Sequence, residues 1–367
     1  MTSAPTLLRV ALAERSYDIE IGTNCLDRLG AFVAQRLSYR HAVVITDGNV
    51  IKPHAEAAVA ALSQPGDGTS RQVELLTVEA GEASKQIDNA VRLWEQLLEH
   101  KADRKTVIVA VGGGVIGDLA GFVAATFARG IPFIQVPTTL LAQVDSSVGG
   151  KVGINLPGAK NMVGAFWQPR GVLIDTAVLA TLPDREYRAG LAEVVKYGVI
   201  LDAEFFEYLE NNVAGLNARD DAVLQHAIYR SCQLKAEVVS QDEREETGLR
   251  AVLNYGHTFC HAIETLTGYG EYLHGEAVAI GMICASRLAE RQGRISAELT
   301  ERQLKLLQAL HLPTELPQLD PQAMLDVMAR DKKAEQGQLR FVLPSRLGHV
   351  ETVRDVPTSD VLAVIAP

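Results

Sequence analysis

The chain has 367 residues, of which 47% are hydrophobic and 22% are charged, proportions that are ordinary for a globular protein. A formal net charge of −10 argues against nonspecific nucleic-acid binding, which needs a basic face. It does not argue against a small anionic substrate, because such a substrate responds to local lysines and arginines. At about 150 residues per domain, the length suggests two domains.

Cysteine usage and apolar patterning bear on where the protein resides. The four cysteines include no CxxC pair, which is typical of free thiols in a reducing compartment. The N-terminus lacks the basic start and sustained apolar run of a signal peptide. The longest apolar stretches are interrupted by Asp118, Arg129 and Asp145, so none supplies the roughly 20 residues of a membrane span. We therefore expect a cytoplasmic protein that binds neither membranes nor nucleic acid.

In the first half of the chain, short β-branched runs alternate with helix-like runs such as NAVRLWEQLLEH (89–100). The predicted strands are HAVVIT (41–46), RQVELLTV (71–78), TVIVAV (106–111), PFIQVP (132–137) and GVLIDT (171–176). Strands separated by helices predict βαβ units and a parallel sheet covered on both faces. We therefore expect an α/β domain over residues 1–176, Rossmann-like but not standard.

After about residue 177 the strand pattern fades and helical periodicity dominates, from LPDREYRAGLAEVVKYGVIL to ISAELTERQLKLLQAL. The segment QLRFVLPSRLG is a candidate short strand or hairpin. These patterns predict a mainly α-helical domain over residues 177–367.

The segment VGGGVIGD (111–118) follows a predicted strand and opens a predicted helix, and Gly112, Gly114 and Gly117 fit the pattern G-x-G-x-x-G. Such glycines let the backbone approach a pyrophosphate at a helix N-terminus, although tight strand–helix packing alone also explains them. The usual acidic partner about 20 residues later is absent, and the motif comes after two earlier strands. Asp47, at the end of an earlier strand, is a candidate for holding the ribose instead, or else a turn or helix cap.

Two further segments carry candidate binding residues. AGEASK (80–85) places Glu82 and Lys85 at a strand end, where an ordinary solvated turn is the simpler interpretation. The segment 136–166 is rich in glycine, and we expect it to be a long irregular stretch. Its Lys151, Lys160 and Asn161 suit anion binding, although a glycine-rich loop can also serve only to turn the chain.

A third group combines a glutamate with histidines from separate segments. Glu193 and Lys196 are spaced i,i+3, and His257 and His261 are spaced i,i+4, so each pair shares a helix face. His274 precedes another helical run. A glutamate with two histidines is a catalytic zinc pattern that leaves coordination positions open, whereas any single histidine is more often an ordinary hydrogen-bonded residue.

Together, VGGGVIGD, VPTTLLAQVDSSVGGKVGIN, KNMVGAFWQP, AEVVKYG, NYGHTFCHAIE and YLHGEAVAIGM resemble the 3-dehydroquinate synthase family of sugar-phosphate cyclases. The resemblance runs from about Asp47 to the DKK segment (331–333). KNMVGAFWQP with LPDREYRAGLAEVVKYG favours the dehydroquinate branch. The resemblance implies an N-terminal NAD domain, a helical metal and substrate domain, and a homodimer.

By matching position, the resemblance also implies roles for individual residues. The implied metal ligands, for zinc with cobalt as a substitute, are Glu193, His257 and His274. The implied NAD set is Asp47, Glu82, Lys85, Gly114, Val115, Ile116, Gly117, Asp118, Thr138, Thr139, Lys151 and Lys160. The implied phosphate pocket is Lys151, Asn161, His261 and Lys332 or Lys333, with Arg129 donated by the other subunit. The implied further substrate contacts are Asp145, Lys196, Lys235, Arg250, Asn254 and Glu246, with Glu245 as the alternative carboxylate.

The implied reaction converts 3-deoxy-D-arabino-heptulosonate 7-phosphate into 3-dehydroquinate and phosphate, in the shikimate pathway of aromatic amino acid biosynthesis. Transient oxidation by NAD acidifies a neighbouring C–H, phosphate leaves by elimination, the hydride returns, and an intramolecular aldol step closes the ring. Two enzyme alternatives are a sibling cyclase and a metal-dependent polyol dehydrogenase, which releases NADH and needs no phosphate pocket. A noncatalytic NAD-binding scaffold has no use for the metal triad.

Overall fold

The computed structural model describes residues 5–64, 68, 70–157, 159–268, 270–331 and 339–366. They form two compact units, Met1–Pro183 with Lys235–Arg244, and Asp184–Leu234 with Glu245–Pro367. The first is an α/β unit and the second is mainly helical, so the predicted fold class is confirmed. Among the described residues, no helix has both the length and the apolar character that crossing a bilayer requires.

Unit 1 is built on a seven-stranded sheet in the order β1-β2-β9-β6-β5-β3-β4, in which β1 pairs antiparallel and the other pairs are parallel. The strands are β1 (Thr6–Val10), β2 (Tyr17–Gly22), β3 (His41–Asp47), β4 (Gln72–Val78), β5 (Val107–Gly112), β6 (Phe133–Pro137) and β9 (Val172–Asp175). The helices are α1 (Leu29–Arg36), α2 (Glu56–Ser63), α3 (Ile87–Glu99) and α4 (Gly114–Thr126). All five predicted strands are present, whereas the β1–β2 hairpin was not predicted.

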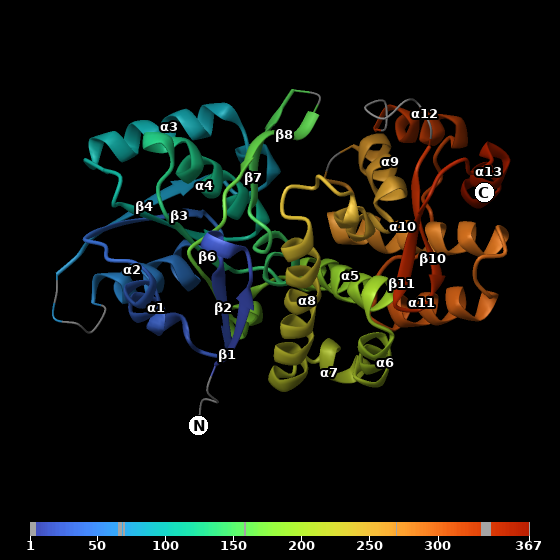
Figure 1. The fold of residues 1–367 in the computed structure, drawn as a ribbon, viewed down its shortest axis with the longest axis horizontal. Coiled ribbons are helices and arrows are strands. Elements are labelled where there is room, and N and C mark those ends of the chain that lie inside the picture. The colour runs from blue at the N-terminus through green and yellow to red at the C-terminus, as the bar shows by residue number, and fades with distance from the viewer. Residues whose placement is uncertain are drawn as a thin grey trace. The chain divides into compact units, whose positions relative to one another are not determined.

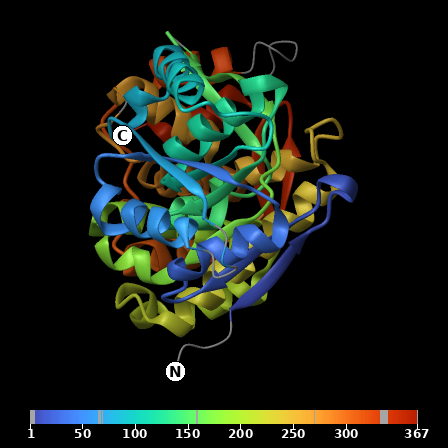
Figure 2. The same cartoon turned by 90° about the vertical axis from the view of Figure 1, so that its left-hand side faces the viewer.

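Two apolar cores cover the two faces of this sheet. One contains side chains of α3 and α4, and the other contains side chains of α1 and α2. Figures 1 and 2 show the sheet between these two helix pairs. Successive residues of a strand point to opposite faces, so Val43 and Ile45 pack in one core and Val44 in the other. Burial on both faces explains the unbroken apolar runs of the central strands.

The segment 136–166, expected to be irregular, is largely regular, so that prediction was wrong. It contains the π-helix Ala142–Ser146 and the antiparallel hairpin of β7 (Lys151–Leu156) and β8 (Ala159–Phe166). Glycines allow the two strands to pair closely: a Cβ on Gly153 would lie 2.7 Å from the carbonyl oxygen of Val163. The same glycines remove the alternating side chains by which a strand is usually predicted.

Unit 2 consists mostly of helices. They are α5 (Asp184–Leu201), α6 (Ala203–Asn211), α7 (Val213–Asn217), α8 (Asp221–Gln241), α9 (His257–Thr267), α10 (His274–Arg291), α11 (Ala297–Ala309), α12 (Pro321–Asp331) and α13 (Thr358–Ile365). The predicted hairpin near the C-terminus is present as β10 (Phe341–Arg346) and β11 (His349–Val353).

The segment Lys235–Arg244, which contains the end of α8 and the residues just after it, belongs to unit 1, where ionic contacts hold it. Lys235 Nζ lies 2.8 Å from Asp145 Oδ1 and 2.6 Å from the Asp145 carbonyl oxygen. Arg15 donates to both carboxylate oxygens of Glu243, at 2.9 and 2.6 Å, and Gln168 donates to one of them at 3.0 Å. A bidentate arginine contact fixes direction as well as distance, so this segment is tied to unit 1 at both ends.

Candidate active site

The glycine motif lies at the carboxyl edge of the sheet in unit 1. From β3 the chain crosses to β4 on one side and then returns to β5 and β6 on the other, so the strand order reverses between β3 and β5. In open α/β sheets, ligands bind in the crevice at the carboxyl ends of the strands at such a switch point. Asp47 ends β3 and Gly112 ends β5, so two candidate residues lie at this edge of the sheet.

Glycines bring the N-terminus of α4 close to the sheet and to the loop after β6. A Cβ on Gly117 would lie 2.8 Å from Gln135 Oε1, and one on Gly113 would lie 3.0 Å from Thr139 Cγ2. The Thr138 amide donates to the carbonyl oxygen of Gly112 at 3.0 Å. Tight packing therefore explains part of the motif. The open N–H groups at the start of α4, which include Val115, remain suited to an anion.

The solvated-turn interpretation of AGEASK fits Glu82, whose side chain is 41% exposed, but not Lys85, which contacts the helix that follows the glycine motif. Lys85 is only 3% exposed, and its Nζ lies 2.5 Å from Asp118 Oδ2 and 3.9 Å from Glu82 Oε1. The side-chain Nδ2 of Asn155 in β7 donates to Glu82 Oε1 at 2.7 Å. The side-chain Oδ1 of Asn155 accepts from the backbone N–H of Asn161 at 2.9 Å. Asn155 therefore links the β7–β8 hairpin to the turn after β4. Sequence reasoning did not single out Asn155, because no spacing rule marks a lone asparagine within a strand.

Other candidates of unit 1 lie at the ends of its elements. Lys151 is exposed at the start of β7, and Lys160 is half-buried in β8. Burial raises the pKa of the Asp47 carboxyl, while backbone hydrogen bonds from Asn49 and Val50 lower it. Ile116 is buried in the core beneath the glycine motif, so its side chain serves packing.

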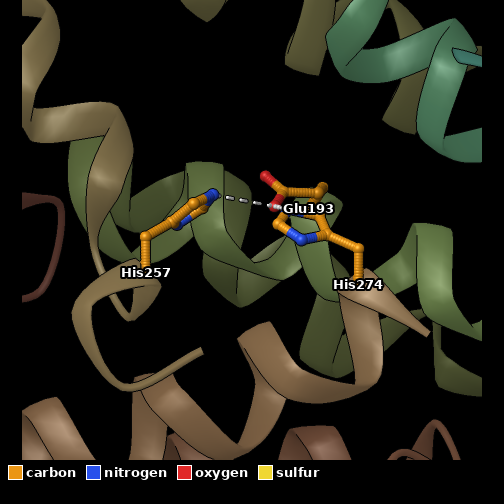
Figure 3. Close-up of side chains that lie close together, drawn as sticks. All are labelled: Glu193, His257 and His274. Atoms are coloured by element: carbon orange, nitrogen blue, oxygen red, sulfur yellow. Dashed lines mark ion pairs between the residues drawn. The ribbon is translucent and has the colours of Figure 1, made fainter. Parts of the chain in front are cut away.

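In unit 2 three side chains converge from three helices. Glu193 from α5 is 1% exposed, and its Oε1 lies 3.9 Å from the Nε2 atoms of both His257 and His274. Figure 3 shows the two imidazoles approaching this carboxylate from different sides. The donor atoms all lie within 4.8 Å of one another. The structure thus gathers the three predicted metal ligands, which lie up to 81 positions apart in the chain.

The surroundings of His257 favour its use as a metal ligand. Burial lowers the pKa of His257 well below its usual value, and the Lys196 ammonium lowers it further, so the imidazole is neutral near neutral pH. Lys196 forms a buried ion pair with the second oxygen of Glu193. His257 Nδ1 lies 3.1 Å from the carbonyl oxygen of Tyr255, which favours a proton on Nδ1 and leaves Nε2 as the ligand atom. His261 lies one turn further along α9, with ring centroids 5.7 Å apart.

The other described candidates of unit 2 lie in the 3-10 helix Leu249–Asn254, which precedes α9, or just before it. Arg250 is buried and its Nε lies 3.5 Å from Glu245 Oε1. Of the two alternative carboxylates it is therefore Glu245 that pairs with Arg250, while Glu246 and Asn254 are exposed. Lys332 and Lys333 lie outside the described residues.

Glycines allow α5, α9 and α10 to pack closely. A Cβ on Gly275 would collide with the carbonyl oxygen of Ala189 in α5, and one on Gly281 would collide with the carbonyl oxygen of Gly256, before α9. The sequence shows these glycines beside the histidines, but their partners are visible only in the folded chain.

Replacement of Gly275 by alanine is expected to separate α5 from α10, because the backbone carbonyl cannot move away freely. We expect a loss of about 1–3 kcal/mol of stability and weaker metal retention. Thermal unfolding and metal content measure the two effects. Gly48→Ala is the matched control, since a Cβ there meets no atom within 4 Å. Equal stability and metal content in the two variants would contradict the packing argument.

Comparison with known proteins agrees with this geometry. Residues 75–189 match the model of the 3-dehydroquinate synthase N-terminal domain, and residues 190–334 match that of the C-terminal domain. A 3-dehydroquinate synthase of Desulforamulus reducens is 50% identical over 360 residues, covering 98% of this chain and 99% of that protein.

Solved structures of related enzymes share the whole fold. One is a 2-deoxy-scyllo-inosose synthase complexed with carbaglucose-6-phosphate, NAD+ and Co2+, with a TM-score of 0.88 and 29% identity over 98% of this chain and 99% of that one. Another is a 2-epi-5-epi-valiolone synthase of Streptomyces hygroscopicus with NAD+ and Zn2+ bound, with a TM-score of 0.87 and 30% identity over 97% of each chain. On the family models and the 50% identity over nearly its full length, this chain belongs to the 3-dehydroquinate synthase family.

Proposed function

We propose that this chain is a 3-dehydroquinate synthase that uses NAD and a divalent metal to convert 3-deoxy-D-arabino-heptulosonate 7-phosphate into 3-dehydroquinate and phosphate. The observation that carries the proposal is the Glu193, His257 and His274 cluster in a chain 50% identical to a 3-dehydroquinate synthase. We further propose that unit 1 binds NAD and unit 2 the metal.

The donor set fits a catalytic zinc or cobalt ion. One carboxylate and two imidazoles, at least one of them neutral near neutral pH, leave coordination positions open for substrate oxygens. The second oxygen of Glu193 forms an ion pair with Lys196. The buried negative charge of Glu193 is therefore partly neutralised by the protein itself.

The switch point at the carboxyl ends of β3 and β5 fits an NAD site. In the proposed arrangement the start of α4, from Gly114 to Gly117, faces the pyrophosphate, and Asp47 accepts from a ribose hydroxyl. The linked Glu82, Lys85 and Asp118 side chains, with Thr138, Thr139, Lys151 and Lys160, complete the proposed cofactor set.

For the substrate we propose two groups of contacts from the chain's own residues. Lys151, Asn161 and His261, with a lysine of the DKK segment, hold the phosphate. Asp145, Lys196, Lys235, Arg250, Asn254 and a carboxylate of the 245–246 pair hold the hydroxyl and carboxylate groups. When bound, NAD accepts and returns a hydride and the metal lowers the pKa of the reacting hydroxyl. The task of the protein is then to orient these groups, since the leaving phosphate can take the acidified proton itself.

We propose a homodimer in which Arg129 reaches the phosphate pocket of the partner. Arg129 is exposed, and Ala128, Arg129 and Gly130 in succession have positive φ angles, at 50°, 68° and 111°. Such strain in non-glycine residues persists where the surroundings enforce it, and it clusters at functional sites. The Gly130 backbone packs on the ring of Trp167. The exposed apolar side chains Ile87, Val91 and Leu98 of α3 form a stripe that a second copy can cover.

We infer a cytoplasmic location. All four cysteines lie in the part of the chain that the structure describes, each is buried, and no disulfide joins them. Burial raises the pKa of both Cys25 and Cys284 to about 12, so these thiols are unreactive.

The test of function is to incubate protein, NAD and the heptulosonate phosphate while measuring phosphate and NADH together. We expect phosphate release without net NADH, because the hydride is returned in each turnover. Accumulating NADH without phosphate would indicate a polyol dehydrogenase. Preference for sedoheptulose 7-phosphate or glucose 6-phosphate in the same assay would indicate a sibling cyclase.

A further inference from the structure

The His274 ring lies between two carboxylates. Its Nε2 is 3.9 Å from Glu193 Oε1, and its Nδ1 is 3.4 Å from Glu264 Oε1. Glu264 comes from α9, and its side chain was not among the candidates of the sequence. Because an imidazole has two nitrogens, a contact at one of them determines which nitrogen keeps a free lone pair.

The two histidines of the cluster are oriented by different means. The ring of His257 contacts the carbonyl oxygen of Tyr255, two residues away, so its orientation is set by local backbone. His274 is the first residue of α10 and its side chain is 35% exposed, so packing restrains its ring only in part. The partner at its Nδ1 is a side chain from another helix, which can be replaced without changing the backbone.

Glu264 is itself held in place. It is 8% exposed, and the Cys260 thiol, one turn earlier on α9, donates to its Oε2 across 3.7 Å. Cys260 Sγ also lies 3.7 Å from His274 Nδ1. The carboxylate is the closer and charged acceptor, and charge-assisted hydrogen bonds are the stronger ones. A carboxylate behind a ligating histidine is a recurring arrangement at metal sites.

We propose that Glu264 is a positioning residue, which accepts the Nδ1 proton of His274 and so turns the Nε2 lone pair toward Glu193 and the metal. This role rests on the proposed metal site. It assigns to Glu264 a share of the metal affinity, although Glu264 does not touch the metal.

The test is cobalt binding to metal-free protein, followed by visible absorption with a competing chelator. Glu264→Leu keeps the side-chain volume and removes the acceptor, and we expect it to weaken binding about 10–100-fold. Glu264→Gln keeps an acceptor oxygen and is expected to restore most of the affinity. Glu20→Leu and Glu20→Gln in unit 1 are matched controls, because Glu20 is also 8% exposed and contacts Arg28 instead of a histidine.

The outcomes separate this role from the metal site itself. Wild-type affinity in Glu264→Leu would overturn the positioning role and leave the metal site standing. No cobalt binding by the unaltered protein would overturn the site and the role together. Two cobalt equivalents in the unaltered protein and one in Glu264→Leu would make Cys260, Glu264 and His274 a second metal site instead.

A measurement on the unaltered protein covers the case in which Glu264→Leu fails to fold. Ring nitrogen-15 chemical shifts of zinc-loaded protein, with the His274 signals assigned from His274→Ala, report which ring nitrogen binds the metal. We expect the metal on Nε2 and the proton on Nδ1. Metal ligation through Nδ1 would overturn the proposal.

Discussion

Removal of divalent metal by a chelator is expected to abolish 3-dehydroquinate formation, and added zinc or cobalt is expected to restore it. Without a cation, Glu193, His257 and His274 offer no Lewis acid to the reacting hydroxyl. A loss of several kcal/mol of transition-state stabilisation corresponds to about a thousandfold in rate or more. Activity is measured as phosphate release, alongside metal analysis of the same sample. Full activity in verified metal-free protein would refute the site.

A matched variant separates loss of metal from loss of fold. His274→Ala is expected to lose metal and activity while remaining folded, because a side chain that is 35% exposed at the start of α10 contributes little to the core. Circular dichroism and thermal unfolding check the fold. A variant that unfolds yet retains zinc would reverse the assignment of His274 as a ligand.

At a substrate concentration well below the KM of either parent, mixing Arg129→Ala protein with Lys151→Ala protein is expected to raise activity above that of both parents. If Arg129 acts across a dimer, a heterodimer contains one site with both defects and one intact site. Random exchange of equal amounts then makes about a quarter of all sites intact. Phosphate release after subunit exchange is the measurement. No recovery over either parent in fully exchanged heterodimers would mean that Arg129 acts in its own chain or not at the site.

The parent Arg129→Ala supplies the control for binding. We expect its KM for the phosphorylated substrate to rise about 10–100-fold, the effect of losing a charge-assisted bidentate contact, while NAD affinity stays nearly unchanged. Weaker NAD binding in this variant would place Arg129 at the cofactor instead. The exposed side chain argues against a general loss of folding.

The main elements of the fold could be predicted because their signal is local. The apolar runs of β3, β5 and β6 and the periodicity of α3 follow from burial on a sheet face or a helix face, which leaves its pattern in consecutive residues. Most glycine-poor segments were therefore predicted, although the β1–β2 hairpin was not. The hairpin of β7 and β8 was missed because its pairing depends on Gly153 and Gly164, whose lack of side chains leaves no alternation to detect.

For the site, the sequence by itself determined which residue types were available: the glycine motif, the anion-binding lysines, and a glutamate with histidines whose joint pattern identified the family. Only the tertiary structure decided which of them meet. It brought Glu193 to His257 and His274, paired Arg250 with Glu245 instead of Glu246, tied Lys235 to Asp145, and revealed Asn155 and Glu264 as linking residues. The physical reason is that side-chain hydrogen bonds and ion pairs act over a few ångströms between helices and strands far apart in the chain, and such contacts leave no periodic trace in the sequence.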